Sequence, residues 1–292
     1  MERKTILITG ASDGVGKETA RTLAKQGHTV IIHGRNKQKL QAVYEEIKTE
    51  TGNSNIEMFT ADFLSLAEVK RFADKIKQKY DQLDVLINNA GAQFSEKREI
   101  TGEGHEKTMV INVFAPFLLT TLLLDILKRS KSARVVTVSS ASHTMGGKPD
   151  LNDFELNHGY SMPKAYGFSK LYVIWVMQHF AAEMKKEGVS NISFNTVHPG
   201  STKSSLGREA MKSFKWKLIY FLWQPMMISI DKAAAPSIRA ATAQELEGVT
   251  GKYFGPKGEE TPSQKYYSPE NEKAVWDYCL KIAEPYLNFI SS

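Results

Sequence analysis

A tyrosine and a lysine at four-residue spacing, Tyr166 and Lys170, are the side chains in this sequence best suited to acid–base chemistry. In a helix, residues at this spacing lie on the same face. A free phenol has a pKa of ~10, and a neighbouring ammonium group favours its ionised form. We therefore expect Lys170 to lower the pKa of Tyr166, so that the phenol can exchange a proton with a substrate oxygen.

The same spacing occurs at three further places, Tyr44/Lys48, Tyr160/Lys164 and Tyr253/Lys257. The first pair lies before the third expected strand, away from the sheet edge where chemistry is expected. The second straddles Pro163, which suits the start of a helix rather than its interior. The third lies among glycines and a proline, which do not suit a helix. We predict that only Tyr166 and Lys170 lie wholly inside a helix.

A glycine-rich loop follows the first apolar run and reads Thr9-Gly10-Ala11-Ser12-Asp13-Gly14-Val15-Gly16-Lys17. Glycines let the backbone turn tightly and approach a pyrophosphate at a helix N-terminus, where free N–H groups favour negative charge. A mononucleotide P-loop has four residues between its first glycine and the Gly-Lys step. Here five residues separate Gly10 from Gly16. The loop therefore predicts a dinucleotide site, and a glycine-rich surface turn is the alternative.

The second predicted strand is followed by Gly34-Arg35-Asn36, without an acidic residue. A site specific for NAD places an acid here for the ribose 2′-hydroxyl, whereas a basic residue accommodates the 2′-phosphate of NADP. Arg35 therefore favours NADP, and a solvated turn residue is its alternative role. Asp13 counts against NADP, because its carboxylate would lie near the phosphate-bearing end.

Short β-branched runs alternate with longer helical patterns along the chain. Strands are predicted over 5–8, 29–32, 56–61, 85–87, 134–138 and 192–197, and helices over 17–26, 40–48, 66–79, 103–128 and 163–186, with Ser65 as a helix N-cap. Near-continuous apolar strands suit a parallel sheet that is covered on both faces. We predict one doubly wound, Rossmann-type α/β domain over 1–292, with a mostly parallel seven-stranded sheet between helices.

The composition is that of an ordinary globular protein. With one cysteine, Cys279, and seven scattered histidines, we expect no internal disulfide, no metal site and a reducing compartment. The net charge of +6 is spread along the chain, which disfavours nucleic-acid binding. The first apolar stretch is too short for a signal peptide, and the longest apolar run, 218–230, is broken by Gln224 and Pro225. We expect a soluble, cytoplasmic protein.

The motifs follow one another in a defined order on the expected elements. After the glycine loop come Asn88-Asn89-Ala90-Gly91, Ser139-Ser140, Tyr166-x-x-x-Lys170 and Pro199-Gly200. In this order they resemble the short-chain dehydrogenase/reductase superfamily, over nearly the whole chain. Within it the chain is most similar to the retinol-dehydrogenase-like branch, through the long Ser140-to-Tyr166 interval, His198-Pro199-Gly200, Gly251-Lys252-Tyr253-Phe254, Ser268-Pro269 and Trp276.

The resemblance implies a catalytic set of Asn112, Ser140, Tyr166 and Lys170. Ser140 would hydrogen-bond the substrate oxygen, with Ser139 as the competing serine. Lys170 would also hold the nicotinamide ribose, and an oxidised nicotinamide would help to lower the pKa of Tyr166. Asn112 would complete a proton relay; without the family, it reads as a helix-interior polar residue facing solvent.

The resemblance also implies a set of residues around an NADP(H) cofactor. Asp62 would contact the adenine edge, and Asn88 and Gly91 would line the ribose side; a strand-end cap and a tight turn are the alternatives. The full predicted cofactor-binding set is Gly10, Ser12, Asp13, Gly14, Val15, Gly16, Arg35, Asn36, Asp62, Phe63, Asn89, Ala90, Gly91, Tyr166, Lys170, Pro199 and Gly200.

A segment rich in apolar and aromatic residues, within 201–230, departs from the alternation of strands and helices. In the family the corresponding segment is a lid over the substrate, which implies an apolar carbonyl or alcohol. The alternatives are ordinary core, a subunit interface, or contact with a membrane surface through Lys212, Lys215, Trp216, Lys217 and Trp223.

We therefore predict an oxidoreductase that interconverts a carbonyl and an alcohol with NADP(H), with NAD less favoured. One alternative is a non-catalytic NADP(H)-binding sensor or scaffold, although a pure binder has no need of an activated phenol. Another is an epimerase or dehydratase, which typically adds a larger carboxy-terminal domain. The predicted helices 103–128 and 163–186 could pair between subunits in a homodimer or homotetramer, as they do in many relatives.

Overall fold

The computed structural model describes residues 2–201 and 228–287. Its strands are β1 (Thr5–Ile8), β2 (Thr29–Gly34), β3 (Ile56–Thr60), β4 (Val85–Asn88), β5 (Ala133–Val138), β6 (Ile192–Val197), β7 (Tyr253–Gly255) and β8 (Gly258–Glu260). Its helices are α1 (Gly14–Lys25), α2 (Lys37–Thr51), α3 (Leu66–Lys79), α4 (Lys107–Met109), α5 (Ala115–Lys128), α6 (Met162–Lys186), α8 (Ile230–Thr242) and α9 (Pro269–Ala283). A π-helical turn, η1 (Val110–Phe114), and 3-10 turns η2 (Ala141–Thr144), η6 (Gln244–Leu246) and η7 (Glu284–Tyr286) complete the described elements.

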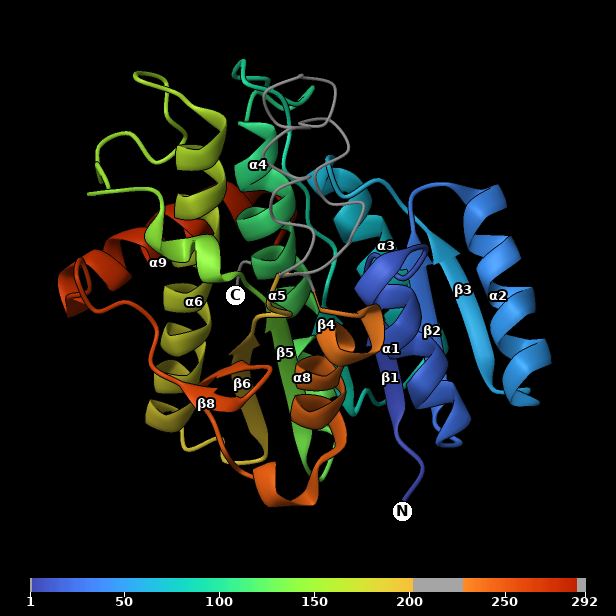
Figure 1. Ribbon diagram of the computed structural model, residues 1–292. Helices are drawn as coiled ribbons and strands as arrows, with labels where there is room; N and C mark the ends of the chain where they lie inside the picture. The colour runs from blue at the N-terminus through green and yellow to red at the C-terminus, as the bar shows by residue number, and fades with distance from the viewer. Residues whose placement is uncertain (1, 202–227, 288–292) are drawn as a thin grey trace.

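The strands form one sheet in the order β3-β2-β1-β4-β5-β6-β7-β8 (Figure 1). β1 to β7 are parallel, and β8 is antiparallel to β7. The α/β fold class is confirmed, but the predicted count of seven strands is one too low. The reason is that β8 is a three-residue Gly-Glu-Glu strand. It lacks the alternation of apolar and polar residues from which a strand can be predicted.

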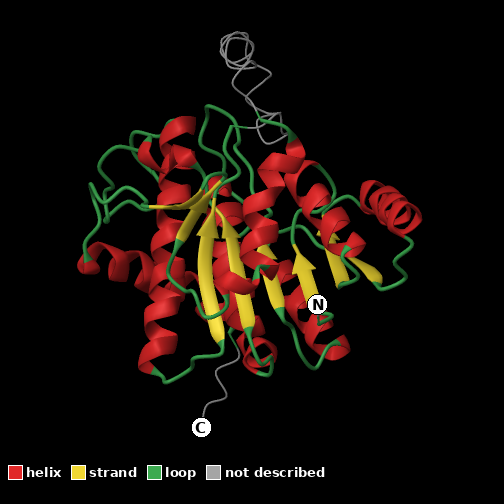
Figure 2. Ribbon diagram, turned by 60° about the horizontal axis from the view of Figure 1, so that its bottom comes forward, coloured by secondary structure: helices red, strands yellow, loops and turns green. Residues whose placement is uncertain are grey.

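Helices cover both faces of the sheet, as Figure 2 shows. Leu7 belongs to a core shared with α3, α5, α6 and α9, whereas Ile6 and Ile8 belong to a second core shared with α1, α2 and α8. Successive side chains of a strand point to opposite faces, so a strand that is covered on both sides must be apolar throughout. This explains the continuous apolar runs in the sequence.

The order in which strands are added to the sheet reverses at its centre, where β1 lies next to β4. From there β2 and β3 extend the sheet to one side, and β5 to β8 extend it to the other. In open α/β sheets, ligands bind beyond the carboxyl ends of the strands at such a point. The glycine loop follows β1, and the segment 88–91 ends β4 and continues beyond it. The topology therefore brings two predicted motifs to one edge of the sheet.

The helix predicted over 103–128 is interrupted, so the prediction of one continuous helix is wrong. The Glu106 side chain caps α4 by accepting from the Met109 N–H at 2.8 Å, and η1 separates α4 from α5. Pro116 has no N–H to donate to the carbonyl four residues back, which disturbs the α-helical ladder. The break places Asn112 inside the π-helical turn.

One stretch of the described residues, Lys107–Lys128, is long and apolar enough to cross a membrane. However, 78% of its most apolar window is buried inside the protein, where α5 packs against α3 and β5. A helix that is apolar on every side suits a buried core position as well as a membrane span. We interpret this stretch as a core helix.

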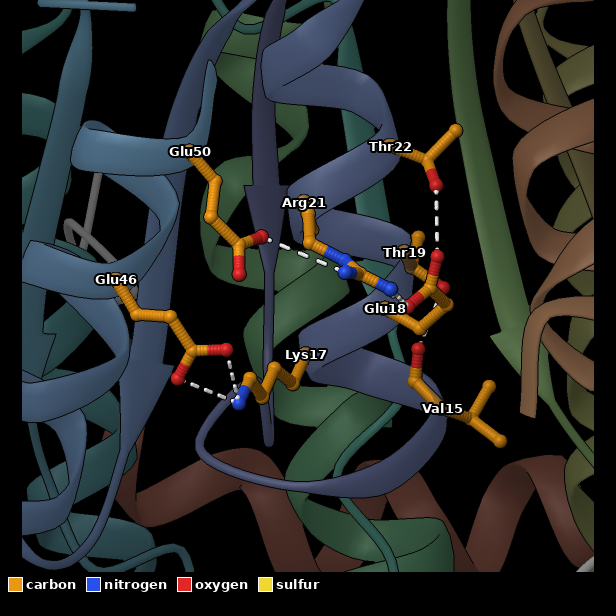
Figure 3. A network of polar contacts seen from close by, with 8 residues as sticks. All are labelled: Val15, Lys17, Glu18, Thr19, Arg21, Thr22, Glu46 and Glu50. Carbon is orange, nitrogen blue, oxygen red and sulfur yellow. Dashed lines mark hydrogen bonds and ion pairs between the residues drawn. The ribbon is translucent and has the colours of Figure 1, made fainter. Parts of the chain in front are cut away.

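Helix α1, which begins at the glycine loop, is joined to α2 by charged contacts (Figure 3). Lys17 contacts Glu46 at 2.7 Å, and Arg21 contacts Glu50 at 3.4 Å as well as Glu18 on its own helix. Exposed ion pairs of this kind contribute little stability individually. We infer that they orient α1 relative to α2, while apolar packing on the sheet holds both helices in place.

The predicted lid at 201–230 lies outside the described residues except for its two ends. The Ile228 N–H donates to the Ser201 carbonyl at 2.8 Å. The ends of this segment therefore lie side by side, just beyond the carboxyl end of β6.

Candidate active site

Tyr166 and Lys170 lie one turn apart on α6, beside the end of β5. Lys170 is 3% exposed, and its Nζ donates to the carbonyl of Val138, the last residue of β5, at 3.0 Å. The same Nζ lies 5.7 Å from the centre of the Tyr166 ring. The lysine amine is thus fixed at the carboxyl edge of the sheet, where the glycine loop also lies.

The two serines after β5 make different contacts. Ser139 is buried, and its hydroxyl donates to the Lys170 carbonyl at 2.7 Å, which joins β5 to α6. The Ser140 side chain instead lies close enough to the Tyr166 phenol to favour its ionised form, and it accepts from the Ser142 N–H at 3.1 Å. The structure therefore brings Ser140 to the phenol and commits the hydroxyl of Ser139 to the fold.

The protein's own groups do not lower the pKa of the phenol. Burial raises the pKa of Tyr166 to about 12, and the interaction with Ser140 opposes that rise. Burial also lowers the pKa of Lys170 to about 7. The expectation that Lys170 makes Tyr166 unusually acidic is therefore wrong for the chain on its own, because a buried amine is only partly charged at neutral pH.

Asn112 is 2% exposed, so its solvent-facing alternative is wrong. Its Nδ2 donates to the Ala92 carbonyl at 2.9 Å and to Ser169 Oγ at 3.0 Å, while its Oδ1 accepts from the Ala92 N–H at 3.1 Å. Ser169 in turn donates to the Tyr166 carbonyl at 2.8 Å. Asn112 thus links the segment after β4 to the helix that carries Tyr166.

Gly91 lies against both Asn112 and Lys170. A Cβ atom at Gly91 would lie 2.8 Å from Asn112 Oδ1 and 3.3 Å from Lys170 Nζ. A side chain there would have to displace one of these groups, so the close approach requires glycine. The structure therefore brings Asn112, Ser140, Tyr166 and Lys170 into one region, and their role as a catalytic set stays a prediction.

The glycine loop packs tightly on the segment after β4. Gly10 has a φ of +67°. A Cβ at Gly10 would lie 2.7 Å from Ala90 Cα, and one at Gly16 would lie 2.3 Å from Asn89 Nδ2. That Nδ2 donates to the carbonyls of Thr9 at 2.8 Å and Gly10 at 3.1 Å. The side chain of Asn89 therefore holds the loop in shape.

The far end of the loop caps α1, whose first turn contains Gly14, Val15 and Gly16. Asp13 accepts from the Gly14 N–H at 2.8 Å, and its second oxygen lies 3.0 Å from Lys39 Nζ. Backbone N–H groups in a helix's first turn lack intrahelical partners and favour an anionic group. Lys39 offsets the negative charge of Asp13. That charge was the feature of the sequence that argued against NADP.

Arg35 and Asp62 lie at the ends of neighbouring strands β2 and β3. The Arg35 side chain is 69% exposed, and its Nη1 lies 3.9 Å from Asp62 Oδ2. A Cβ at Gly34 would lie 3.1 Å from Ser12 Cβ, so the glycine loop reaches the end of β2. An exposed guanidinium, paired with Asp62, is therefore present where a ribose 2′-phosphate is expected.

Some predicted cofactor residues serve the fold through their side chains. Asn36 caps α2. The Phe63 ring is buried and stacks on His33 with 4.0 Å between ring centres, which leaves only its backbone for a ligand. Asn88 is buried and donates to two threonine hydroxyls between β5 and α5. The Asn88 side chain therefore joins β4 to β5 and α5, and the expectation that Asn88 lies on the ribose side of the cofactor stays a prediction.

His33, on β2, is a supporting residue that sequence reasoning missed. Its Nδ1 accepts from the Gly10 N–H at 3.3 Å, and its Nε2 donates to the Ala61 carbonyl at 3.1 Å. Burial lowers the pKa of His33 to about 4, so the ring is neutral and one nitrogen is free to accept. A histidine at the end of an otherwise apolar strand was the only signal.

Pro199 and Gly200 follow β6 and are half-buried. Gly200 has a φ of +74°, and its N–H donates to His198 Nδ1 at 3.3 Å. His198 Nε2 in turn contacts Glu260 on β8 at 2.9 Å. The edge strand β8, which the sequence analysis did not predict, therefore supports the loop after β6.

Helical location does not single out Tyr166 and Lys170. Tyr44 and Lys48 also lie wholly inside a helix, α2, with Lys48 Nζ 5.6 Å from the Tyr44 ring centre. The prediction that only one pair lies within a helix is wrong, since the helix predicted over 40–48 already contains Tyr44 and Lys48. The distinguishing feature of Tyr166 is its contact with Ser140.

Among residues 2–201 and 228–287, no group of three or more His, Cys, Asp or Glu side chains is placed to hold a metal ion. Cys279 is buried on α9 as a free thiol.

A protein-family model described as short chain dehydrogenase matches residues 4–214. Human polyprenol dehydrogenase is 35% identical over 277 residues, covering 94% of this chain and 83% of that protein. Mouse retinol dehydrogenase 13 is 35% identical over 286 residues, covering 96% and 83%. Human retinol dehydrogenase 12 is 34% identical over 279 residues, covering 96% and 86%.

Solved structures share the fold over most of the chain. A protein from Mycobacterium paratuberculosis superposes with a TM-score of 0.76 at 28% identity, covering 96% of this chain and 93% of that one. A short chain dehydrogenase from Shigella flexneri, complexed with NADP, gives a TM-score of 0.68 at 27% identity, covering 88% and 98%. The chain belongs to the short-chain dehydrogenase family of oxidoreductases, in its retinol-dehydrogenase-like branch.

Proposed function

We propose that this enzyme interconverts an apolar alcohol and its carbonyl compound by hydride transfer with NADP(H), with Tyr166 as the general acid and base. The observation that carries the proposal is the contact between Ser140 and Tyr166 beside the buried amine of Lys170. This cluster lies at the same sheet edge as a glycine loop that opens a helix. A binding protein without catalysis has no use for such an arrangement.

The family binds nicotinamide cofactors, and the residues present fit one. The glycine loop turns without side chains at Gly10 and Gly16, and the N-terminus of α1 offers N–H donors for a pyrophosphate. Bound NADP(H) would supply or accept the hydride, and its oxidised ring would add positive charge to the site. Lys170 would hold the ribose nearest the reacting ring, beside Gly91 and Asn112.

The side chains then divide the work on the substrate oxygen. Ser140 would hydrogen-bond that oxygen and hold it next to the phenol of Tyr166, which donates the proton in reduction and accepts it in oxidation. Before the substrate binds, the interaction with Ser140 opposes the rise in the phenol's pKa that burial causes. Asn112 would connect this site to the segment after β4 through Ala92.

Replacing Tyr166 by Phe tests the proposal, because it removes only the proton-bearing oxygen. We expect turnover to fall by at least about a hundredfold, since general acid–base catalysis supplies ~10²–10⁴-fold. Tyr160→Phe is a matched control, because Tyr160 precedes α6 and donates to the Ser95 carbonyl at 3.3 Å. NADPH oxidation measured with a panel of aldehydes and ketones is the assay. If Tyr166→Phe keeps turnover within about tenfold of the parent, the assigned mechanism is wrong.

We propose NADP rather than NAD because Arg35 is exposed at the end of β2 and Lys39 offsets Asp13. The similar structure from Shigella flexneri, which is described as complexed with NADP, supports this choice. Arg35→Asp should raise the ratio of NAD to NADP efficiency by at least about tenfold, because a phosphate contact is lost and a repelling carboxylate is gained. An unchanged ratio would remove Arg35 from the site.

The substrate class is proposed from the relatives named for retinol and polyprenol, both apolar alcohols, and from the apolar composition of the predicted lid. The residues invoked for contact with a membrane surface lie outside the described residues. Location in the cytoplasm, assembly into a homodimer or homotetramer, and the absence of a nucleic-acid partner stay predictions.

A further inference from the structure

His143, in η2, directly follows the Ser140 turn and is 8% exposed. Its backbone N–H donates to the Ser140 carbonyl at 3.1 Å, and its ring Nδ1 lies 2.8 Å from the same oxygen. On the other side of the ring, the Ser263 N–H donates to Nε2 at 2.9 Å. His143 therefore connects Ser140 to Ser263, which lies in the segment that follows β8.

These partners determine where the ring proton lies. A backbone N–H can only donate, so Nε2 must accept from Ser263. A carbonyl can only accept, so Nδ1 must carry the proton and donate to Ser140. Both ring nitrogens are then satisfied in the neutral form, and burial lowers the pKa of His143, which keeps it neutral.

The groups packed around His143 do not make it a proton carrier. The buried Tyr253 ring lies edge-on at 5.4 Å between ring centres, with its hydroxyl 3.5 Å from Nδ1. Beyond it, His198 stacks on Tyr253, and Glu260 contacts His198. His198 lowers the pKa of His143 and Glu260 raises it, each less than burial does.

We propose that His143 is a positioning residue, which holds the Ser140 carbonyl through Nδ1–H so that the Ser140 hydroxyl meets the Tyr166 phenol. This inference rests on the proposed function of Ser140 and Tyr166. Two donors on one carbonyl, the backbone N–H and the ring Nδ1–H of His143, fix the backbone of the serine. A serine free to turn would lose part of its interaction with Tyr166, and the pKa of the phenol would then rise.

The two amide residues give the sharpest test, because each reproduces one nitrogen of the ring. In His143→Asn the amide nitrogen takes the place of Nδ1 and can still donate to the Ser140 carbonyl. In His143→Gln the amide reaches the place of Nε2 and keeps only the Ser263 contact. We expect kcat to fall about tenfold in the Gln variant and to recover largely in the Asn variant. The KM for NADPH should change little in either.

A pH profile separates positioning from mere loss of packing. In the proposed mechanism the profile follows the phenol of Tyr166, which faces Ser140, Lys170 and Tyr253. Lys170 has a lower pKa, about 7, and is the same in every variant compared. For alcohol oxidation, the rise of kcat with pH should shift to higher pH in Ser140→Ala and, less far, in His143→Gln. His143→Gln should cause no further shift in the Ser140→Ala background. His179→Gln is the control, because that histidine pairs with Glu272 between α6 and α9 and should leave the profile unshifted.

The outcomes are distinguishable from failure of the proposed function. If Tyr166→Phe and Ser140→Ala remain active, the proposed function fails and the inference fails with it. If those variants are impaired while the two His143 amides are equally active, or equally impaired without a shift in the pH profile, only the positioning role is overturned. Circular dichroism on each variant shows whether it folds. Among folded variants, the comparison of kcat between His143→Asn and His143→Gln decides the positioning role.

Discussion

The amine of Lys170 is held in a place that suits catalysis better than stability. It is almost fully buried, and its ammonium form is so disfavoured that its pKa falls to about 7. Among the residues that the structure describes, its polar partner is the carbonyl of Val138. A buried charge with so little compensation costs free energy of folding, and an apolar side chain of similar shape avoids that cost.

We therefore expect Lys170→Met to abolish turnover and yet to raise the free energy of unfolding by about 1–3 kcal/mol at pH 7. Because burial lowers the pKa of Lys170 from 10.5 to about 7, the unfolded parent binds more protons between these values. Parent stability thus rises with pH across this window, and its deficit against the variant shrinks.

Urea unfolding of both proteins without cofactor, at pH 7 and about pH 9.5, measures this difference. Lys164→Met on the same helix is the control, because Lys164 lies over the Phe168 ring near the surface and should show no such pH dependence. A Lys170→Met variant less stable than the parent at pH 7 would show that the amine supports the fold.

At the residue scale, the sequence predicted the groups that we propose to react, but not the residues that support them. Ser140, Tyr166 and Lys170 could be named because their order along the chain resembles a family. His33 and His143 could not, because a histidine that braces a backbone has no characteristic spacing. Its role depends on Gly10 and Ser263, which the fold brings to it from elsewhere in the chain.

At the element scale, α6 and the turn before it are in unusually close contact. A Cβ at Gly167 would lie 2.6 Å from the Gly146 nitrogen, and one at Gly146 would lie 2.2 Å from the Phe168 ring. Gly167 directly follows Tyr166 on the helix, while Gly146 ends the turn that begins at Ser140. Because Gly167 and Gly146 have no side chains, the turn that begins at Ser140 can lie close to the helix that carries Tyr166.

Gly167→Ala should push the turn away from the helix, because the obstructing atoms are backbone and cannot rotate aside. We expect a loss of about 1–3 kcal/mol in stability and a fall in kcat of about tenfold or more, with a smaller change in the KM for NADPH. Gly102→Ala is the control, since a Cβ there meets nothing within 4 Å. Unchanged kcat in Gly167→Ala would mean that this contact does not set the geometry of the site.

The elements themselves were largely legible from the sequence, and the exceptions have local causes. Continuous apolar runs predicted the central strands, because each is covered on both faces. The break before α5 was missed because apolar periodicity continues through Pro116, although the hydrogen bonds do not. β8 was missed because its short, polar sequence carries no strand pattern.

At the scale of the whole molecule, α6 is enclosed by its own chain. Residues 167–177 are all buried over about three helical turns, so no face of the helix is free along this stretch. Helix α9 covers one side, where Trp276 packs edge-on against Phe117 and Phe180 at 5.1 and 4.7 Å between ring centres. Sequence alone could not show this, because the faces of an apolar helix look alike.

We therefore expect that α6 does not form a subunit contact, whatever the oligomeric state, because a partner helix would first have to displace α9. Sedimentation equilibrium gives the mass in solution, to be compared with 32.7 kDa for one chain. Hydrogen exchange at several protein concentrations then locates any interface. Exchange in α6 peptides should not depend on concentration, since their protection comes from within the chain. Protection of α6 that falls on dilution, together with a mass above that of one chain, would show that a partner covers this helix and that α9 is displaced in the assembly.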